Sequence, residues 1–235
     1  MAYSRRNRDI SMSNGEIIAG CIYWPIYLLL LAPALMFVLS FMDVEVTDLR
    51  VNLCYFITNF LVVAIVFRRY LIASLGQFGR TFWQCAQAVV LGLAFYYLMT
   101  WGLSLVFSLL DLTVVSPNDE AISGLVSQQS SAMMVCTVLL APLSEEVLNR
   151  GLIFGNLARK SRWLAYVVST AVFCFLHVFS YLGTLTLPAT LLVLLSYVPA
   201  GIALGWTMEK AGTVWAPILV HAVINLIATG LMTAF

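Results

Sequence analysis

Residues 141–155 read APLSEEVLNRGLIFG, an apolar stretch that carries Glu145, Glu146 and Arg150. Apolar sequence continues on both sides of these charges, which favours a helix that crosses a membrane. An ionised side chain near the centre of a bilayer costs on the order of 3 kcal/mol, so such residues commonly face a polar cavity. The stretch therefore predicts a membrane helix that contributes to a functional site.

The composition of the whole chain agrees with this prediction. Of its 235 residues, 62% are hydrophobic and only 10% are charged. The mean hydropathy is +0.96, whereas soluble domains are far more polar. The net charge of +1 gives no sign of a nucleic-acid partner. We expect an all-α, polytopic helix bundle in the lipid bilayer, with about seven transmembrane helices and an eighth left open. The expected spans lie near residues 17–42, 51–67, 82–110, 132–157, 163–183, 187–208 and 213–235.

The distribution of charge predicts the orientation, because cytoplasmic loops of membrane proteins collect Lys and Arg. Basic residues gather in alternate loops, whereas the opposite loops hold Arg50 and acidic residues such as Asp43 and Asp119. This pattern predicts a cytoplasmic N-terminus, and the compact size favours a prokaryotic cell membrane. The one long loop, residues 116–131, is polar and rich in turn-forming residues, and we interpret it as a surface connector.

The charged residues of the 141–155 helix divide into two groups by their spacing. Glu145 and Glu146 point about 100° apart on an α-helix, so they are not expected to do the same job. Glu146 lies four residues before Arg150, the favourable order for an ion pair, and we interpret this pair as structural. Glu145 shares its face with Asn149 and has no neighbouring cation. It is therefore the candidate general base or acid.

The two histidines of the chain both lie in apolar spans, at depths similar to that of Glu145. Phe173 precedes His177 by one turn and is expected to pack around its ring. His221 and Asn225 are four residues apart, so an imidazole and an amide face the same point. Two neutral donors in a water-poor cavity are suited to stabilise a tetrahedral oxyanion.

These residues form three motifs in order, EExxxR, FxxxH and HxxxN. The motifs resemble those of the CAAX protease and bacteriocin-processing family (CPBP, also called Abi), intramembrane proteases related to the type II prenyl-protein endopeptidase. The resemblance covers roughly residues 131–235, which we expect to be a catalytic membrane core. Residues 1–130 are expected to supply three membrane helices and the outer loop. Asn149 departs from the family pattern, in which an aromatic residue often precedes the arginine.

The resemblance implies a glutamic endopeptidase in which Glu145 and His177 activate water while His221 and Asn225 hold the oxyanion. The implied substrate is a membrane-associated protein or peptide, either of CAAX type or a bacteriocin or signal-peptide precursor. The sequence carries no signal for an oligomeric state.

Three other interpretations remain open. The two histidines and a glutamate could complete a zinc site with an open water position. The helical HExxH arrangement is absent, and Asn225 suits hydrogen bonding better than zinc, so we expect no metal or other cofactor. The polar cluster could belong to a non-proteolytic regulatory or immunity partner. Proton-coupled transport would also use buried Glu and His, but the chain shows no internal repeat.

Overall fold

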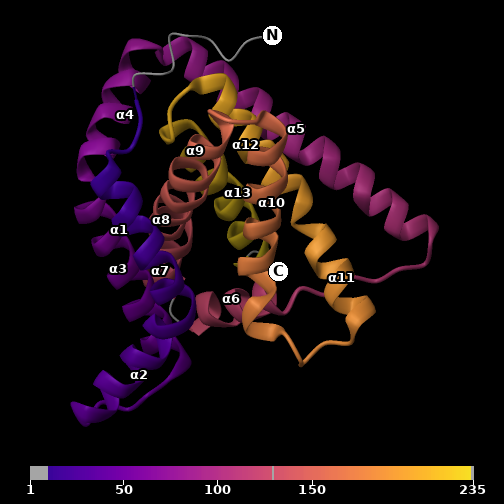
Figure 1. Ribbon diagram of the computed structural model, residues 1–235. Helices are drawn as coiled ribbons and strands as arrows, with labels where there is room; N and C mark the ends of the chain where they lie inside the picture. Colours follow the sequence, from indigo (N-terminus) through magenta and orange to yellow (C-terminus); the bar gives the residue numbers. More distant parts are fainter. Residues whose placement is uncertain (1–9, 129, 234–235) are drawn as a thin grey trace.

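The computed structural model describes residues 10–128 and 130–233, and the regular structure within these ranges is helical (Figure 1). The predicted all-α class is confirmed. The elements are α1 (Asn14–Pro25), the π-helical η2 (Ile26–Leu30), α2 (Leu31–Phe41), α3 (Asp48–Val66), α4 (Arg68–Arg80), α5 (Phe82–Leu109), α6 (Pro117–Gln128), α7 (Ser130–Val135), the π-helical η3 (Cys136–Leu140), α8 (Ala141–Glu146), the π-helical η4 (Val147–Phe154), α9 (Gly155–Ala158), α10 (Arg162–Val178), the 3-10 turn η5 (Phe179–Tyr181), α11 (Leu187–Ser196), α12 (Val198–Ala211) and α13 (Trp215–Thr233).

Six helical stretches are long and apolar enough to cross a membrane, and each overlaps one of the first six predicted spans. They are Asn14–Phe41, Asp48–Val66, Phe82–Leu109, Ser131–Ala158, Arg162–Tyr181 and Leu187–Ala211. The seventh predicted span falls on α13, whose apolar part, Trp215–Gly230, is shorter. Seven full-length spans are therefore not confirmed over the described ranges. The six spans indicate an integral, multi-pass membrane protein.

The orientation in the membrane stays a prediction. Figure 1 places α4, the α9–α10 connection and the α12–α13 connection toward one end of the bundle, and α2 and α6 toward the other. The basic residues at 5–8, which contributed to the predicted cytoplasmic N-terminus, lie outside the described residues, as do 234 and 235 at the end of the last predicted span.

One helical stretch lies at the centre of the bundle and is much more buried than the outer helices. In the most apolar window of Ser131–Ala158, 50% of the residues are buried, against 6% in Asn14–Phe41 and in Phe82–Leu109. Large apolar side chains stay exposed on the outer helices, as lipid contact allows; they include Phe37, Phe41, Trp83 and Trp163. The core cluster around the central stretch includes Val63, Phe67, Val147, Leu148 and Phe154. The helix with the charged motif is thus the one that its neighbours enclose.

Close packing of α12 depends on two glycines. A Cβ added at Gly201 would lie 2.6 Å from Thr170 Cγ2 of α10, and one at Gly205 would lie 3.2 Å from Tyr166 Cε1. Small residues at this spacing allow membrane helices to approach each other closely. Any larger side chain at Gly201 would push α12 away from α10.

The segment between the second and third spans forms α4, which packs against the α12–α13 connection. Thr213 Oγ1 donates a hydrogen bond to the Ser74 carbonyl at 2.8 Å, and the Trp215 indole donates to the Leu71 carbonyl at 3.1 Å. These bonds fix the start of α13, the helix that carries the HxxxN motif.

The interpretation of residues 116–131 as a plain connector is incomplete, because most of this segment is the helix α6. Ser116 caps the helix by accepting the N–H of Asp119 at 3.3 Å, and Pro117 takes the first helical position, where its missing N–H costs nothing. The helix contacts α3 and α13. The polar, turn-forming composition of the segment had suggested a loop.

Candidate active site

The helix that carries the EExxxR motif alternates between α and π geometry. The short α8, which ends with both glutamates, lies between the π-helical segments η3 and η4. Pro142 lies in the first turn of α8. π-Helical turns are rare and occur frequently at functional sites, because their i→i+5 hydrogen bonding changes which side chains face a neighbour.

Glu146 and Arg150 form the predicted ion pair. Arg150 Nη1 lies 3.1 Å from Glu146 Oε1, and neither side chain has exposed surface. Arg150 also donates through Nη2 to the Gly201 carbonyl at 3.1 Å. Its guanidinium carbon lies 4.6 Å from the centroid of the Phe173 ring, a cation–π distance. The buried cation is therefore compensated from three helices.

His221 joins the two glutamates. Its Nδ1 lies 2.9 Å from Glu146 Oε1, while its Nε2 lies 3.9 Å from Glu145 Oε2. Glu146 Oε1 also accepts from Arg150 and so acts as an acceptor here, which means that Nδ1 of His221 carries the hydrogen. A neutral His221 would then present a lone pair at Nε2. Only an imidazolium could donate from Nε2, so the expectation of a neutral imidazole donor does not fit this geometry.

His177, like His221, uses its Nδ1 in a hydrogen bond within the protein and leaves Nε2 without such a partner. Its Nδ1 lies 2.8 Å from the Phe173 carbonyl, which can only accept, so Nδ1 is the donor. The neutral ring therefore has its lone pair at Nε2, the state that a base needs. The Phe173 ring packs against both imidazoles, with centroid distances of 4.4 Å to His177 and 5.8 Å to His221. The predicted packing of Phe173 around His177 is confirmed.

Asn225 is oriented by the irregular helix opposite it. Its Nδ2 donates to the Thr137 carbonyl of η3 at 2.8 Å. An amide group carries two N–H donors, so this bond leaves the second one available. The hydrogen bond holds the side chain in one rotamer at the edge of the cavity.

A cavity of about 450 Å³ brings the four predicted catalytic residues together. They line it from three helices: Glu145 from α8, His177 from α10, and His221 and Asn225 from α13. The Glu145 side chain keeps 18% of its surface exposed. Glu146 and Arg150 are not among the lining residues, which agrees with their separation from Glu145 in the sequence analysis.

The sequence predicted that Asn149 shares the cavity face of Glu145, and this prediction is wrong. The Asn149 side chain is 1% exposed, it does not line the cavity, and neither amide atom has a hydrogen-bond partner among the described residues. The physical reason is that the backbone from Val147 onward is π-helical. The wider π-helical turns change the face that Asn149 presents, although Glu146 still reaches Arg150 four residues further on.

The part of the chain that supplies these four residues matches a known protein family. Residues 127–227 match the model of the family described as Rce1-like, type II CAAX prenyl endopeptidase Rce1-like. These residues form an Rce1-like CAAX endopeptidase (CPBP) domain. No curated protein and no solved structure matches the chain.

The Rce1-like domain contains all three motifs, from Glu145 to Asn225. The predicted family is confirmed. Membership implies a protease with a membrane-associated protein as substrate. The buried contact between Glu146 and His221 is consistent with an active site at this place.

Sequence reasoning missed the contribution of the first helices. Tyr27 of η2 and Tyr55 of α3 line the cavity with their rings stacked at 5.5 Å, and Asn52 lies on the same wall. An asparagine and two tyrosines within apolar spans were the available signal. The cavity thus takes residues from both sides of the domain boundary expected near residue 131, and that division stays a prediction.

No three His, Cys, Asp or Glu side chains are placed to hold a metal ion anywhere in residues 10–128 and 130–233. His221 illustrates why, because its Nδ1 is already bound to Glu146 and its ring lies between two carboxylates.

Proposed function

We propose that this protein is an intramembrane endopeptidase that hydrolyses a peptide bond of a membrane-associated protein by metal-independent activation of water. One observation carries the proposal: Glu145, His177, His221 and Asn225 line a single cavity inside the bundle. They come from motifs that are far apart in the sequence. A purely structural polar cluster has no need for a base, two imidazoles and an amide on one cavity wall.

Water activation is assigned to Glu145 with His177. Glu145 is the partly exposed carboxylate of the pair, whereas Glu146 is occupied by Arg150 and His221. His177 Nε2 is free to accept a hydrogen bond from water because Nδ1 is bound to a carbonyl. Glu145, assisted by His177, would take the proton of a cavity water as the water oxygen attacks the peptide carbonyl, and this proton would pass to the leaving amine as the C–N bond breaks.

Oxyanion stabilisation is assigned to His221 and Asn225. Glu145, Glu146 and Arg150 together carry a charge of −1 when ionised, and an imidazolium at His221 brings the group to zero. His221 would then donate from Nε2 toward the developing negative oxygen, and Asn225 from its second N–H. In this arrangement Glu146 is a positioning residue that holds the His221 ring through its Nδ1.

For the substrate, we infer a membrane-anchored protein cut near a CAAX-type carboxyl terminus. The family description, which names a CAAX prenyl endopeptidase, supports this class. The cavity supports it as well, because apolar side chains such as Leu28, Phe56 and Leu176 lie beside the polar ones. Precursors of bacteriocins or signalling peptides are the alternative substrate class.

The decisive experiment compares wild type with Glu145→Gln, which keeps the size of the side chain and removes the base. Membrane peptides from cells that produce either protein are identified by mass spectrometry. Cleavage products that depend on Glu145 are expected, and their termini name the substrate class. The matched control is Glu45→Gln, an exposed carboxylate outside the cavity, which should cleave as wild type does. Equal product from the Glu145→Gln protein would contradict the proposal.

A further inference from the structure

The ring of His177 is held by contacts from two different elements. Its Nδ1 bond and its 4.4 Å ring contact both involve Phe173, which lies one turn away on the same helix. These contacts move with α10 and cannot fix the ring relative to the other helices. A contact from another element comes from Tyr197, whose ring centroid lies 4.5 Å from that of His177, with the two ring planes at 33°.

Tyr197 lies between α11 and α12, and its hydroxyl is bound by the first turn of α6. The hydroxyl donates to Asp119 Oδ1 at 2.9 Å. With its hydrogen used in this way, it accepts from Ser116 Oγ at 2.7 Å and from Asn118 Nδ2 at 3.4 Å. A tyrosine hydroxyl has one donor and two acceptor lone pairs, so these three residues satisfy all of them.

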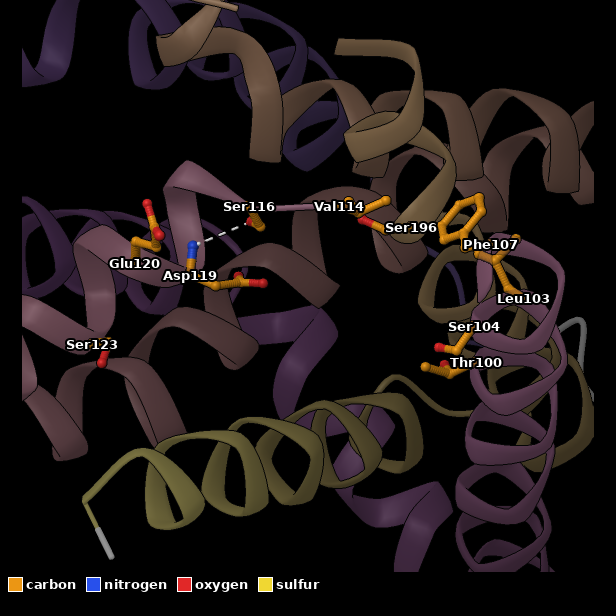
Figure 2. Close-up of a pocket in the computed structure, with 10 residues that line it drawn as sticks. All are labelled: Thr100, Leu103, Ser104, Phe107, Val114, Ser116, Asp119, Glu120, Ser123 and Ser196. Atoms are coloured by element: carbon orange, nitrogen blue, oxygen red, sulfur yellow. Dashed lines mark hydrogen bonds between the residues drawn. The ribbon is translucent and has the colours of Figure 1, made fainter. Parts of the chain in front are cut away.

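The same turn of α6 separates two cavities. Tyr197, Asn118 and Asp119 line the catalytic cavity. Ser116 and Asp119 also line a second pocket of about 600 Å³, which Figure 2 shows between α6 and the end of α5, with the Ser116–Asp119 hydrogen bond drawn. The hydroxyl network is therefore built into the wall of the catalytic cavity.

We propose that Tyr197 is a positioning residue: its ring sets the orientation of His177, and its hydroxyl anchors that ring to the first turn of α6. The inference deepens the proposed function, on which its kinetic consequence rests. A base must lie within hydrogen-bond reach of the water proton. A displacement of about 1 Å at a reacting group can cost on the order of 100-fold in rate.

Two variants separate the ring from the hydroxyl. Tyr197→Phe keeps the ring beside His177 but removes all three hydrogen bonds to α6. Tyr197→Leu removes the ring as well. We expect kcat to fall about tenfold in the first and about 100-fold in the second, with KM within about threefold of wild type, because orientation and not binding is lost. If the ring positions His177, the Phe variant must be more active than the Leu variant.

A second measurement does not depend on cleavage. The chain contains only two histidines, so nitrogen NMR of histidine-labelled protein can be assigned with His177→Gln and His221→Gln. In Tyr197→Leu we expect the His177 ring signals to shift and broaden, while those of His221 stay in place. In Tyr197→Phe we expect the His177 signals to shift less than in Tyr197→Leu, while amide hydrogen exchange speeds up at least tenfold in residues 118–121.

The control is Tyr97→Leu, an exposed tyrosine of α5 outside both cavities, which should change neither measurement. The positioning role would be overturned if the His177 signals were unchanged in Tyr197→Leu. It would also be overturned if amide exchange in α6 were unchanged in Tyr197→Phe. Should Tyr197→Leu not fold, the exchange rates of Tyr197→Phe decide alone. Normal NMR behaviour of the wild type without any cleavage would instead count against the proposed protease function.

Discussion

At the scale of single residues, the adjacent glutamates of α8 have different surroundings. Glu146 is fully buried and shares one oxygen between Arg150 and His221. Glu145 lines the cavity and keeps part of its surface exposed. Desolvation explains the division, because a buried charge is stable only when it is paired and hydrogen-bonded, whereas a reactive carboxylate must remain accessible to water and substrate.

Replacing Glu146 should therefore affect stability, and replacing Glu145 should not. We expect Glu146→Gln to lose about 3–5 kcal/mol of unfolding free energy, because the Arg150 cation stays buried without its counter-charge. Thermal unfolding in detergent measures the difference. The double variant Glu146→Gln/Arg150→Met should recover much of the loss, since it removes both charges. A strictly additive double variant would show that the pair is not coupled.

Asn225 offers a test of the oxyanion role. Asn225→Ala should lower kcat by about 100- to 1,000-fold with little change in KM, the range measured when one oxyanion donor is removed. The assay uses the substrate identified by mass spectrometry, at several concentrations. Thr229→Val, one turn further along α13, is the control, because Thr229 lines the same cavity and its hydroxyl donates to the backbone carbonyls of Asn225 and Leu226 in its own helix. A KM effect alone for Asn225→Ala would assign this residue to substrate binding.

At the scale of elements, the site depends on how closely α12 packs on α10 and on the central helix. The Gly201 carbonyl receives Arg150, and its missing side chain leaves room for Thr170. The backbone of α12 therefore replaces part of the hydration that the guanidinium loses on burial.

Gly201→Ala tests this packing against a second helical glycine. We expect a loss of about 1–3 kcal/mol in stability, because the new methyl group would overlap Thr170 at 2.6 Å and displace α12. Gly102→Ala in α5 meets nothing within 4 Å. That control should be neutral or more stable by about 0.5–1 kcal/mol, as Ala favours a helix over Gly. Unfolding of both variants in detergent compares them directly, and equal stabilities would remove the packing argument.

At the scale of the whole molecule, the membrane spans enclose a cavity to which both the Rce1-like domain and the preceding helices contribute. Residues 127–227 carry the motifs, while Tyr27, Asn52 and Tyr55 complete the wall. A fragment that holds the family domain alone would lack this part of the wall. The polar side chains that the domain contributes to the cavity would then face lipid.

The proposed metal independence can be tested on the assembled protein. We expect cleavage by the purified protein to be unchanged, within about twofold, after incubation with EDTA or 1,10-phenanthroline. The reason is that His221 Nδ1 and Glu146 Oε1 are already hydrogen-bonded to each other and so are not free to bind a metal ion. Elemental analysis of the active preparation provides the control. Loss of activity with a chelator and its return with zinc would instead favour the zinc-protease interpretation.

The sequence by itself determined the membrane class, six of the seven predicted spans, the family and four of the polar residues that line the cavity. These follow from local composition and from short motifs, which are properties of neighbouring residues. The Glu146–Arg150 pair was equally predictable, since four residues on a helix bring two side chains together.

Only the tertiary structure decided how the motifs meet. It placed His221 between Glu145 and Glu146, turned Asn149 away from the cavity through the π-helical segment, and made α6 part of the cavity wall. It also brought Tyr197 to His177. The physical reason is that these contacts join residues on separate helices, whose relative positions depend on packing over the whole bundle and not on any local pattern.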